Sequence, residues 1–259
     1  MYSRRTFLKI SASITALVAG GYFFKSSGGP KVKHILSSAS HERLGISLSL
    51  SKSTSKLELL LNDRELIQGK KTDREGKHWQ FLSNKLTSNE SYELQILSED
   101  EAIYQRWSIK TFPDPETEIK KLSFMSFTCP GGGDAFRASG REFFKPFSFR
   151  QNIFKEGLSK NPDFAIAIGD HVYWDLRGES SPPVGRNSKL IKFFLGGYLR
   201  LRYGSFKRLE SANSKNNESV LKKIGNEQIA SLYGTRFKST PIFFVPDDHD
   251  YFENDDAEE

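Results

Sequence analysis

The chain has 259 residues, of which 37% are hydrophobic, 13% aromatic and 27% charged, and these values exclude a disordered or fibrous protein. Its length allows one or two domains with a substantial core. The formal net charge is +6, but residues 1–28 hold four basic and no acidic residues, so the remainder carries about +2 (6 minus 4). That charge is too small to indicate nucleic-acid binding. The single cysteine, Cys129, excludes an intramolecular disulfide and a zinc module of CxxC pairs.

Residues 1–28 have the features of an export signal. Arg4 and Arg5 form a twin-arginine pair, and the apolar segment Ile10 to Phe24 follows. The pattern resembles Tat signals of bacteria, which implies export of an already folded protein by the Tat machinery to the periplasm or beyond. An ordinary amphipathic or membrane-anchoring start is the alternative. No clear A-x-A cleavage site follows, so retention of the segment as a membrane anchor also stays open.

Residues 30–112 predict a small β domain. Apolar and polar residues alternate along several short segments, as in antiparallel strands with one buried face. Polar clusters separate these segments as turns, and about 80 residues of short strands favour an immunoglobulin or fibronectin-like sandwich. The segment Phe112–Glu116 contains two prolines and predicts a linker. The alternating apolar residues are Leu44, Ile46, Leu48, Leu50, Tyr92, Leu94, Ile96, Trp107 and Ile109.

Residues 120–259 predict an α/β domain. Three apolar runs, Leu122–Thr128, Phe164–Ile168 and Ile242–Val245, indicate strands that are covered on both faces. Helical patterns separate them, which favours parallel strands in right-handed βαβ units. Ligands of such folds bind at the carboxyl ends of the strands. The predicted helical stripes consist of Phe149, Ile153, Phe154, Gly157 and Leu158, and of Leu221, Ile224, Gln228 and Leu232.

The three strand ends carry motifs that resemble a known family. They are Thr128-Cys129-Pro130-Gly131, Gly169-Asp170-His171-Val172-Tyr173 and Asp247-Asp248-His249-Asp250. A cysteine after the first strand, then GDxxY and DDH[DE], is similar to the alkaline phosphatase D (PhoD-like) family of binuclear metallophosphatases. The Tat-like signal and the N-terminal β domain also fit. The resemblance implies a signal at 1–28, a β domain at 30–112 and an α/β metallophosphatase-type sandwich at 120–259.

The resemblance also implies roles for individual residues. Cys129, Asp170 and Tyr173 would hold iron, and Asp170 with Asp248 would hold a second ion, calcium, manganese or magnesium. A carboxylate can bridge two cations, and thiolate and phenolate ligands favour iron. His249 would be the catalytic histidine. The implied reaction is hydrolysis of a small phosphoric ester, as a phosphatase or phosphodiesterase, by a metal-bound hydroxide at a binuclear site.

Simpler interpretations exist for the same residues. Cys129 alone would be a small buried residue, Asp170 a cap of the following turn, and residues 247–250 a solvated acidic loop. Two strand-end carboxylates without a nearby basic residue in sequence would repel each other, however, and a cation relieves that repulsion. His171 is expected to be a neighbour of the site and not a ligand.

One feature of the family is absent from this sequence. Metallophosphatases of this type place further histidine ligands downstream of the DDHD segment, and no histidine follows His249 here. We therefore expect an incomplete sequence that holds half of the sandwich, and the alternative function is an exported, non-catalytic binding protein with an incomplete metal site. Leu190–Glu210 predicts an amphipathic helix, with a substrate lid or a membrane-surface helix as alternatives. Ser211–Ser219 predicts a loop.

Overall fold

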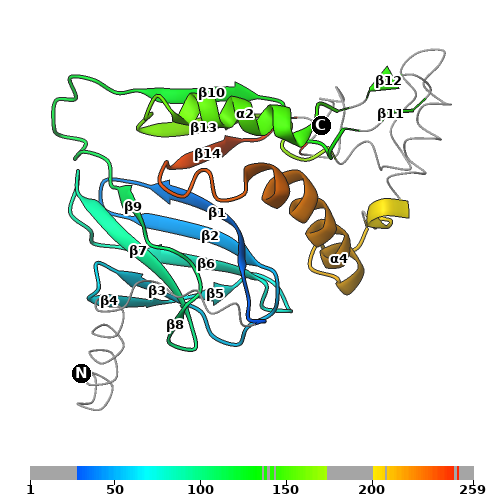
Figure 1. The fold of residues 1–259 in the computed structure, drawn as a ribbon, viewed down its shortest axis with the longest axis horizontal. Coiled ribbons are helices and arrows are strands. Elements are labelled where there is room, and N and C mark those ends of the chain that lie inside the picture. Colours follow the sequence, from blue (N-terminus) through cyan, green and yellow to red (C-terminus); the bar gives the residue numbers. More distant parts are fainter. Residues whose placement is uncertain are drawn as a thin grey trace.

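The computed structural model of the protein describes residues 28–135, 137–138, 141–142, 144–173, 201–207, 209–247 and 250. Its N-terminal part is built from two antiparallel sheets, and its C-terminal part from a parallel sheet with helices (Figure 1). The export signal predicted upstream of Gly28, and residues 190–200 of the predicted amphipathic helix, lie outside the described residues. Within the described ranges, no helix combines the length and the apolar composition needed to cross a bilayer.

The N-terminal sheets contain nine strands, and every pair in them is antiparallel. The first sheet has the order β1-β2-β6-β5. The second has the order β4-β3-β7-β8, and β9 also pairs with β7. The strands are β1 (Val32–Ala39), β2 (Leu44–Leu50), β3 (Glu58–Leu61), β4 (Glu65–Gln68), β5 (Lys70–Lys71), β6 (His78–Ser83), β7 (Ser91–Ser98), β8 (Glu101–Ala102) and β9 (Trp107–Lys110).

The apolar faces of these two sheets meet in one core. Leu48 of β2 and Phe81 of β6 pack with Leu94 and Ile96 of β7, and all four are at most 1% exposed. The alternation of β6, in which every second side chain is buried, shows the two-residue period on which the prediction rested. The β domain is therefore present as two sheets, and its membership of the immunoglobulin or fibronectin class stays a prediction.

The C-terminal part contains a three-stranded parallel sheet in the order β10-β13-β14. The strands β13 (Phe164–Ile168) and β14 (Ile242–Val245) have the predicted bounds, and β10 (Phe124–Thr128) begins two residues later than predicted. Two short strands, β11 (Arg137–Ala138) and β12 (Arg141–Glu142), pair antiparallel after β10. The parallel direction brings the carboxyl ends of all three central strands to one edge.

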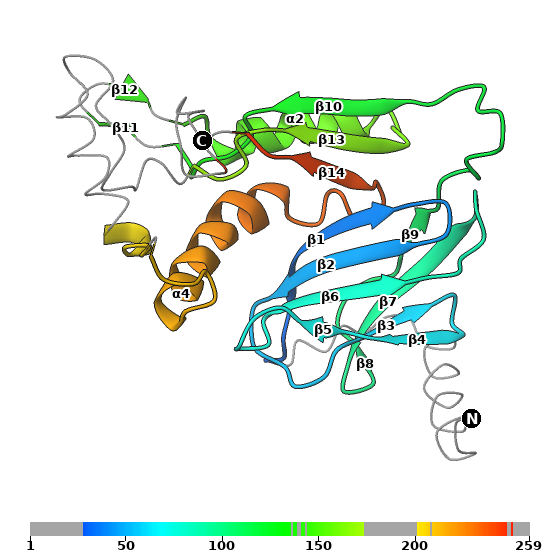
Figure 2. The ribbon, with the colours of Figure 1, turned by 180° about the vertical axis from the view of Figure 1, so that it is seen from behind.

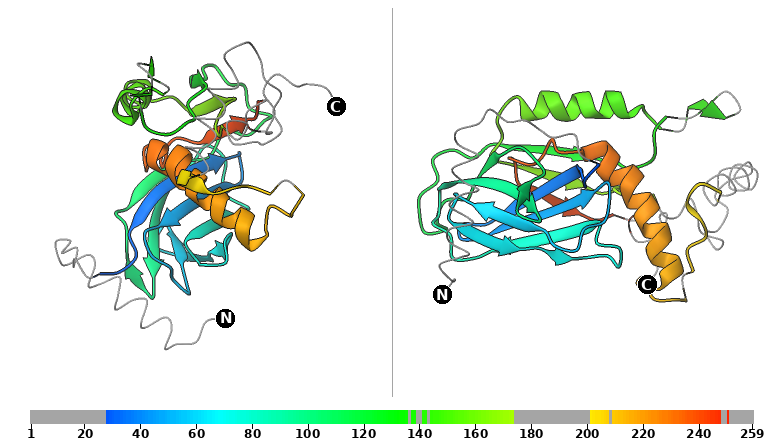
Figure 3. Two further views of the ribbon diagram at one scale, coloured as in Figure 1. Left: turned by 90° about the vertical axis from the view of Figure 1, so that its right-hand side faces the viewer. Right: turned by 60° about the horizontal axis from the view of Figure 1, so that its bottom comes forward.

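The helix α2 (Phe147–Leu158) packs against one face of this sheet (Figure 3). The predicted stripe on this helix was wrong in part, because Phe149 and Ile153 are 54% and 48% exposed. Phe154 is buried as predicted, and Arg150, which was not part of the predicted stripe, is buried as well. The buried stripe of the helix includes Arg150, because the guanidinium of Arg150 donates to backbone carbonyls and can therefore enter the interior.

On the opposite face the Phe112 ring packs near Phe164 and Phe243, but the rest of that face is open (Figure 2). The prediction of strands covered on both faces was therefore wrong for the described part of the chain. Ala165 and Ile242 point into the core, whereas Phe124, Ile168 and Val245 are 57%, 42% and 48% exposed. No described element packs over these three side chains. The described residues thus supply one sheet of the expected two-sheet sandwich.

A second helical segment precedes β14. The helix α4 (Lys215–Ile224) continues directly into the π-helix η2 (Gly225–Ser231), and Figure 3 shows the two running along the side of the β domain. The prediction of a loop over Ser211–Ser219 was wrong from residue 215 onward. Ser214 caps the helix by accepting the backbone N–H of Asn217, and the fully buried Asn217 side chain bonds the loop before the helix.

The two parts of the chain are joined by packing as well as by the chain between them. The predicted linker has no regular structure, but the ring of Phe112 lies 5.8 Å from that of Phe164 and 6.2 Å from that of Phe243. On the other side, the Lys222 ammonium of α4 lies 3.2 Å from a carboxylate oxygen of Asp73 in the β domain. The linker prediction therefore holds for the backbone and not for the packing of Phe112.

Candidate metal site

Two of the predicted ligands lie at the carboxyl edge of the parallel sheet. Cys129 directly follows β10, and Asp170 follows β13 after one glycine, Gly169. Cys129 and Asp170 have φ angles of 50° and 52°, in the left-handed region that side chains other than glycine rarely adopt. Such strained residues persist only where the surrounding structure holds them, and they gather at functional sites. The strain at both strand ends makes this edge the first candidate for a site.

Asp170 is the centre of the arrangement. It is 8% exposed, and its Oδ2 accepts a hydrogen bond from the Tyr173 hydroxyl at 3.3 Å. Its Oδ1 is buried and has no hydrogen-bond partner among the residues that the structure describes. A buried carboxylate oxygen without a donor is costly unless a cation compensates it. The geometry of Asp170 therefore fits a metal ligand better than a cap.

Negative charge at this edge acts on the neighbouring thiol. A hydrogen bond with Asp170 is the largest cause that raises the pKa of Cys129, and burial and the charge of Asp247 act in the same direction. The hydroxyl of Thr128, whose Oγ1 lies 3.1 Å from the Cys129 Sγ, opposes them. A bound cation would reverse this balance, because it favours the thiolate and attracts the carboxylates.

Glycine allows the loops to approach closely at this edge. Gly169 has a φ of +66°, and a Cβ atom at this position would lie 2.6 Å from the Asp247 carboxylate. At Gly131 a Cβ atom would overlap the carbonyl oxygen of Asp170, to which the Gly131 N–H donates at 2.9 Å. The loops after β10 and β13 are therefore packed backbone against backbone, and the Asp247 side chain of the loop after β14 packs against Gly169.

Asp250 joins the loops after β13 and β14. Its Oδ1 accepts the backbone N–H groups of His171 and Val172, both at 2.8 Å, and its Oδ2 accepts that of Asp247 at 3.1 Å. The His171 ring is buried, with Nε2 3.0 Å from the Val245 carbonyl oxygen. The role of His171 as a neighbour of the site stays a prediction. The fourth member of the DDHD motif is thus a structural residue of the loop.

Arg150 holds the loop that follows Cys129. Its Nη1 and Nη2 donate to the four carbonyl oxygens of residues 130–133, at distances between 2.5 and 3.3 Å. Its Nε donates to the Lys145 carbonyl oxygen at 3.1 Å. Burial lowers the pKa of Arg150. A charged donor that satisfies several carbonyls at once fixes the path of the backbone from which the thiol projects.

The structure brings Cys129, Asp170 and Tyr173 together, whereas Asp248 and His249 lie outside the described residues. The three fit a metal by their donor set, which combines a thiol, a buried carboxylate oxygen without a donor and a phenol. Among the described side chains, no three of the types His, Cys, Asp and Glu are placed to hold an ion together. The proposed ligand set includes Tyr173, which is of none of these types, and Asp248.

Sequence reasoning left several residues of this edge without a role. The acidic motif singled out Asp247 and Asp250 but did not show that one lies against Gly169 and the other bonds two loops. Arg150 and Gln228 were missed as supports of the loops. The only sequence signal for them was polarity within a helical stripe, which does not specify a partner.

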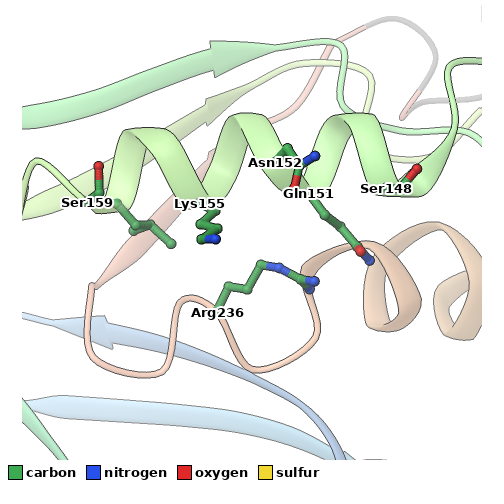
Figure 4. A pocket seen from close by; sticks show the side chains of 7 residues that line it. Ser148, Gln151, Asn152, Lys155, Ser159 and Arg236 are labelled. Carbon is green, nitrogen blue, oxygen red and sulfur yellow. The ribbon is translucent and has the colours of Figure 1, made fainter.

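A basic groove lies apart from this edge, between α2 and the segment after η2 (Figure 4). The side chains of Lys155 and Arg236 enter it from opposite walls, and no acidic residue lines it. Arg236 also donates to carbonyl oxygens at the end of the preceding helix. The remaining lining residues are Ser148, Gln151, Asn152, Leu158 and Ser159.

Comparison with known proteins finds similarity to solved structures, whereas no protein-family model and no curated protein matches the chain. A structure of PhoD aligns with 88% of this chain and 40% of its own, at a TM-score of 0.47 and 15% identity. The purple acid phosphatase PPD1 from yellow lupin (Lupinus luteus) seeds aligns with 85% of this chain and 35% of its own, at a TM-score of 0.44 and 11% identity. The sensor domain of the anti-sigma factor RsgI4 in Pseudobacteroides cellulosolvens aligns with 36% of this chain and 100% of its own, at a TM-score of 0.28 and 13% identity. PhoD, which the sequence motifs resemble, is thus among the structural neighbours, and this chain spans less than half of PhoD and PPD1.

Proposed function

We propose that this chain supplies part of the binuclear metal site of an exported hydrolase of phosphoric esters. The observation that carries the proposal is the meeting of Cys129, Asp170 and Tyr173 at one edge of the sheet, with a buried Asp170 oxygen that lacks a donor. Two of these donors, Cys129 and Asp170, follow strand ends in strained conformations, which gather at functional sites.

Each residue has a defined task in this proposal. Cys129, Asp170 and Tyr173 would hold an iron ion, and Asp170 with Asp248 would hold a second ion. When bound, such a pair of cations polarises the phosphoryl oxygens and lowers the pKa of water toward neutrality. His249 donates a proton to the leaving oxygen. Asp250 and the glycines hold the three loops close to one another, so that the proposed ligands stay in place.

The finer parts of the proposal rest on the sequence. The substrate is a small phosphoric ester, monoester or diester, and the second ion is calcium, manganese or magnesium. The twin-arginine pattern of residues 1–28 supports export by the Tat machinery to the periplasm or beyond, with membrane attachment only through that segment if it is retained.

Metal analysis of the purified protein tests the site. We expect the wild type to retain iron and a second ion, and Asp170→Asn to lose both, since the bridging carboxylate is removed. The matched control is Asp163→Asn, because Asp163 lies at the other end of β13 and its side chain, among the residues that the structure describes, accepts hydrogen bonds from Ser123 alone. Equal metal content in the wild type and Asp170→Asn would contradict the site.

Hydrolysis of p-nitrophenyl phosphate and bis-p-nitrophenyl phosphate tests the activity. Turnover that disappears in Asp170→Asn and persists in Asp163→Asn would support the hydrolase. Retained metal without turnover of either ester by the wild type would favour the alternative, a non-catalytic binding protein.

A further inference from the structure

One buried amide connects the two loops that carry the proposed ligands. Gln228 belongs to η2 and is 2% exposed. Its Oε1 accepts the backbone N–H of Gly132, three residues after Cys129, at 3.1 Å. The same oxygen accepts the backbone N–H of Tyr173, also at 3.1 Å. A single side-chain atom therefore spans the gap between the loop after β10 and the loop after β13.

The backbone around Gln228 is unusual in a way that serves this contact. Gly225–Ser231 forms a π-helix, a rare conformation that often occurs at functional sites. Its neighbours Ile224 and Leu232 are buried in apolar clusters on either side, with 1% and 0% exposure. The apolar contacts therefore fix the segment at both ends, while the wider turn lies where Gln228 faces the loops.

Arg150 differs from Gln228 in what it can fix. Within the described part of the chain its guanidinium bonds the carbonyls of the loop after Cys129 and of Lys145 alone, so it sets the shape of one loop. Gln228 bonds one N–H from each loop and, together with the direct bond from the Gly131 N–H to the Asp170 carbonyl oxygen, sets their separation. The separation decides whether the Cys129 sulfur and the Tyr173 oxygen can reach one ion.

We propose that Gln228 is a positioning residue that holds the Cys129 loop and the Asp170–Tyr173 loop at the separation required to bind one metal ion. The inference rests on the proposed function, because it presumes that these loops share an ion. Gln228 contacts the proposed ligand Tyr173 through its backbone N–H, and in this role it does not bind the metal ion or the substrate itself. Removal of the Gln228 amide would change the geometry of the loops. Mutation of such an outer partner of metal ligands typically lowers metal affinity by about 10–100-fold.

Binding of cobalt(II) to the purified, metal-stripped full chain tests the proposal. Cobalt(II) gives a thiolate charge-transfer band, which reports Cys129 directly, and visible bands that report the coordination geometry. Gln228→Met keeps the volume and removes the acceptor, so we expect an affinity about 10–100-fold lower and a weaker charge-transfer band. Gln228→Glu keeps an oxygen that accepts both N–H groups, and we expect an affinity at or above that of the wild type.

The matched control is Gln95→Met in β7 of the β domain. Gln95 is also 2% exposed, and its side-chain atoms have no hydrogen-bond partner among the described residues. Its substitution should leave the cobalt affinity and both sets of bands unchanged. Circular dichroism and thermal melting establish that each variant is folded, and if Gln228→Met is not, Gln228→Asn replaces it, because its amide is withdrawn by one methylene.

The outcomes separate the inference from the proposed function. If the wild type shows no cobalt bands, the metal site fails and Gln228 has nothing to position. If the wild type binds cobalt and folded Gln228→Met binds it with equal affinity and an equal charge-transfer band, only the positioning role is overturned. Loss in Gln228→Met with recovery in Gln228→Glu supports the role, because a purely structural defect would not be repaired by an acceptor alone.

Discussion

A buried histidine makes the stability of the β domain depend on pH. The Nδ1 of His34 in β1 lies 2.6 Å from the Oγ of Ser49 in β2, and His34 is 8% exposed. Burial lowers the pKa of His34 from 6.5 to about 4, and the nearby His78 adds to the effect. The pKa of His78 is itself lowered, again mainly by burial, with Lys222 acting in the same direction and Asp73 against it.

The sign and size of this pH dependence of the unfolding free energy follow from proton linkage. The unfolded chain takes up a proton on residue 34 near pH 6.5, whereas the folded chain takes it up only near pH 4. Acid therefore favours the unfolded state, and the stability present above pH 6.5 is lost as the pH falls toward 4. At about 1.4 kcal/mol per pH unit, His34 accounts for a loss of about 3 kcal/mol between pH 7.5 and pH 4.

Urea unfolding followed by tryptophan fluorescence measures this loss, since Trp79 and Trp107 lie in the core of the β domain. His34→Asn keeps an acceptor near the position of Nδ1 and removes the titration. Its unfolding free energy should fall by about 3 kcal/mol less than that of the wild type over the same pH range. His41→Asn, in the turn after β1, is the control and should behave as the wild type. An equal fall in wild type and His34→Asn would refute the reasoning.

Three further predictions concern the α/β part and its junction with the β domain. Arg150→Lys should lower the unfolding free energy by about 3 kcal/mol, because carbonyls buried around the guanidinium lose their donors, and a loss below about 1 kcal/mol in urea unfolding would contradict the clamp. Phe124→Ser should reduce binding of the dye ANS to the open sheet face while it changes stability by less than about 1 kcal/mol, and unchanged dye fluorescence would show that the dye binds elsewhere. Lys222→Met should cost about 2 kcal/mol at pH 7. Hydrogen bonds and Lys222 hold the pKa of Asp73 below its usual range despite burial, so this cost should shrink as Asp73 is protonated in acid, and a cost independent of pH would argue against the pair.

The strands were predictable because their signals are local. The runs at β13 and β14 are short and apolar and end in polar residues, and the alternation in β6 has a period of two. The meeting of Cys129 with Asp170 followed from strand direction, because parallel neighbours end at one edge. These predictions needed no knowledge of any distant contact.

The corrections concern contacts that no local pattern specifies. A charged residue such as Arg150 is read as exposed, and only the four carbonyls in front of it make its burial favourable. Asn217 lies in a polar stretch that predicts a loop, yet its buried amide satisfies the backbone of the loop before it. The open face of the sheet was missed because a continuous apolar run indicates burial without showing what covers it. Gln228 shows the same limit, since its two partners are 96 and 55 residues away in sequence.

The β domain supports the proposed site through the segment that carries Gln228. The backbone N–H of Ile35 in β1 donates to the carbonyl oxygen of Gly234 at 3.0 Å, and the Ser37 hydroxyl donates to that of Lys238 at 2.8 Å. Both acceptors lie within ten residues of Gln228, between η2 and β14. Strand β1 therefore holds the segment between η2 and β14. The residues just before this segment include Gln228, which bonds the two loops of the proposed ligands. This support from β1 gives the β domain a part in the geometry of the proposed metal site.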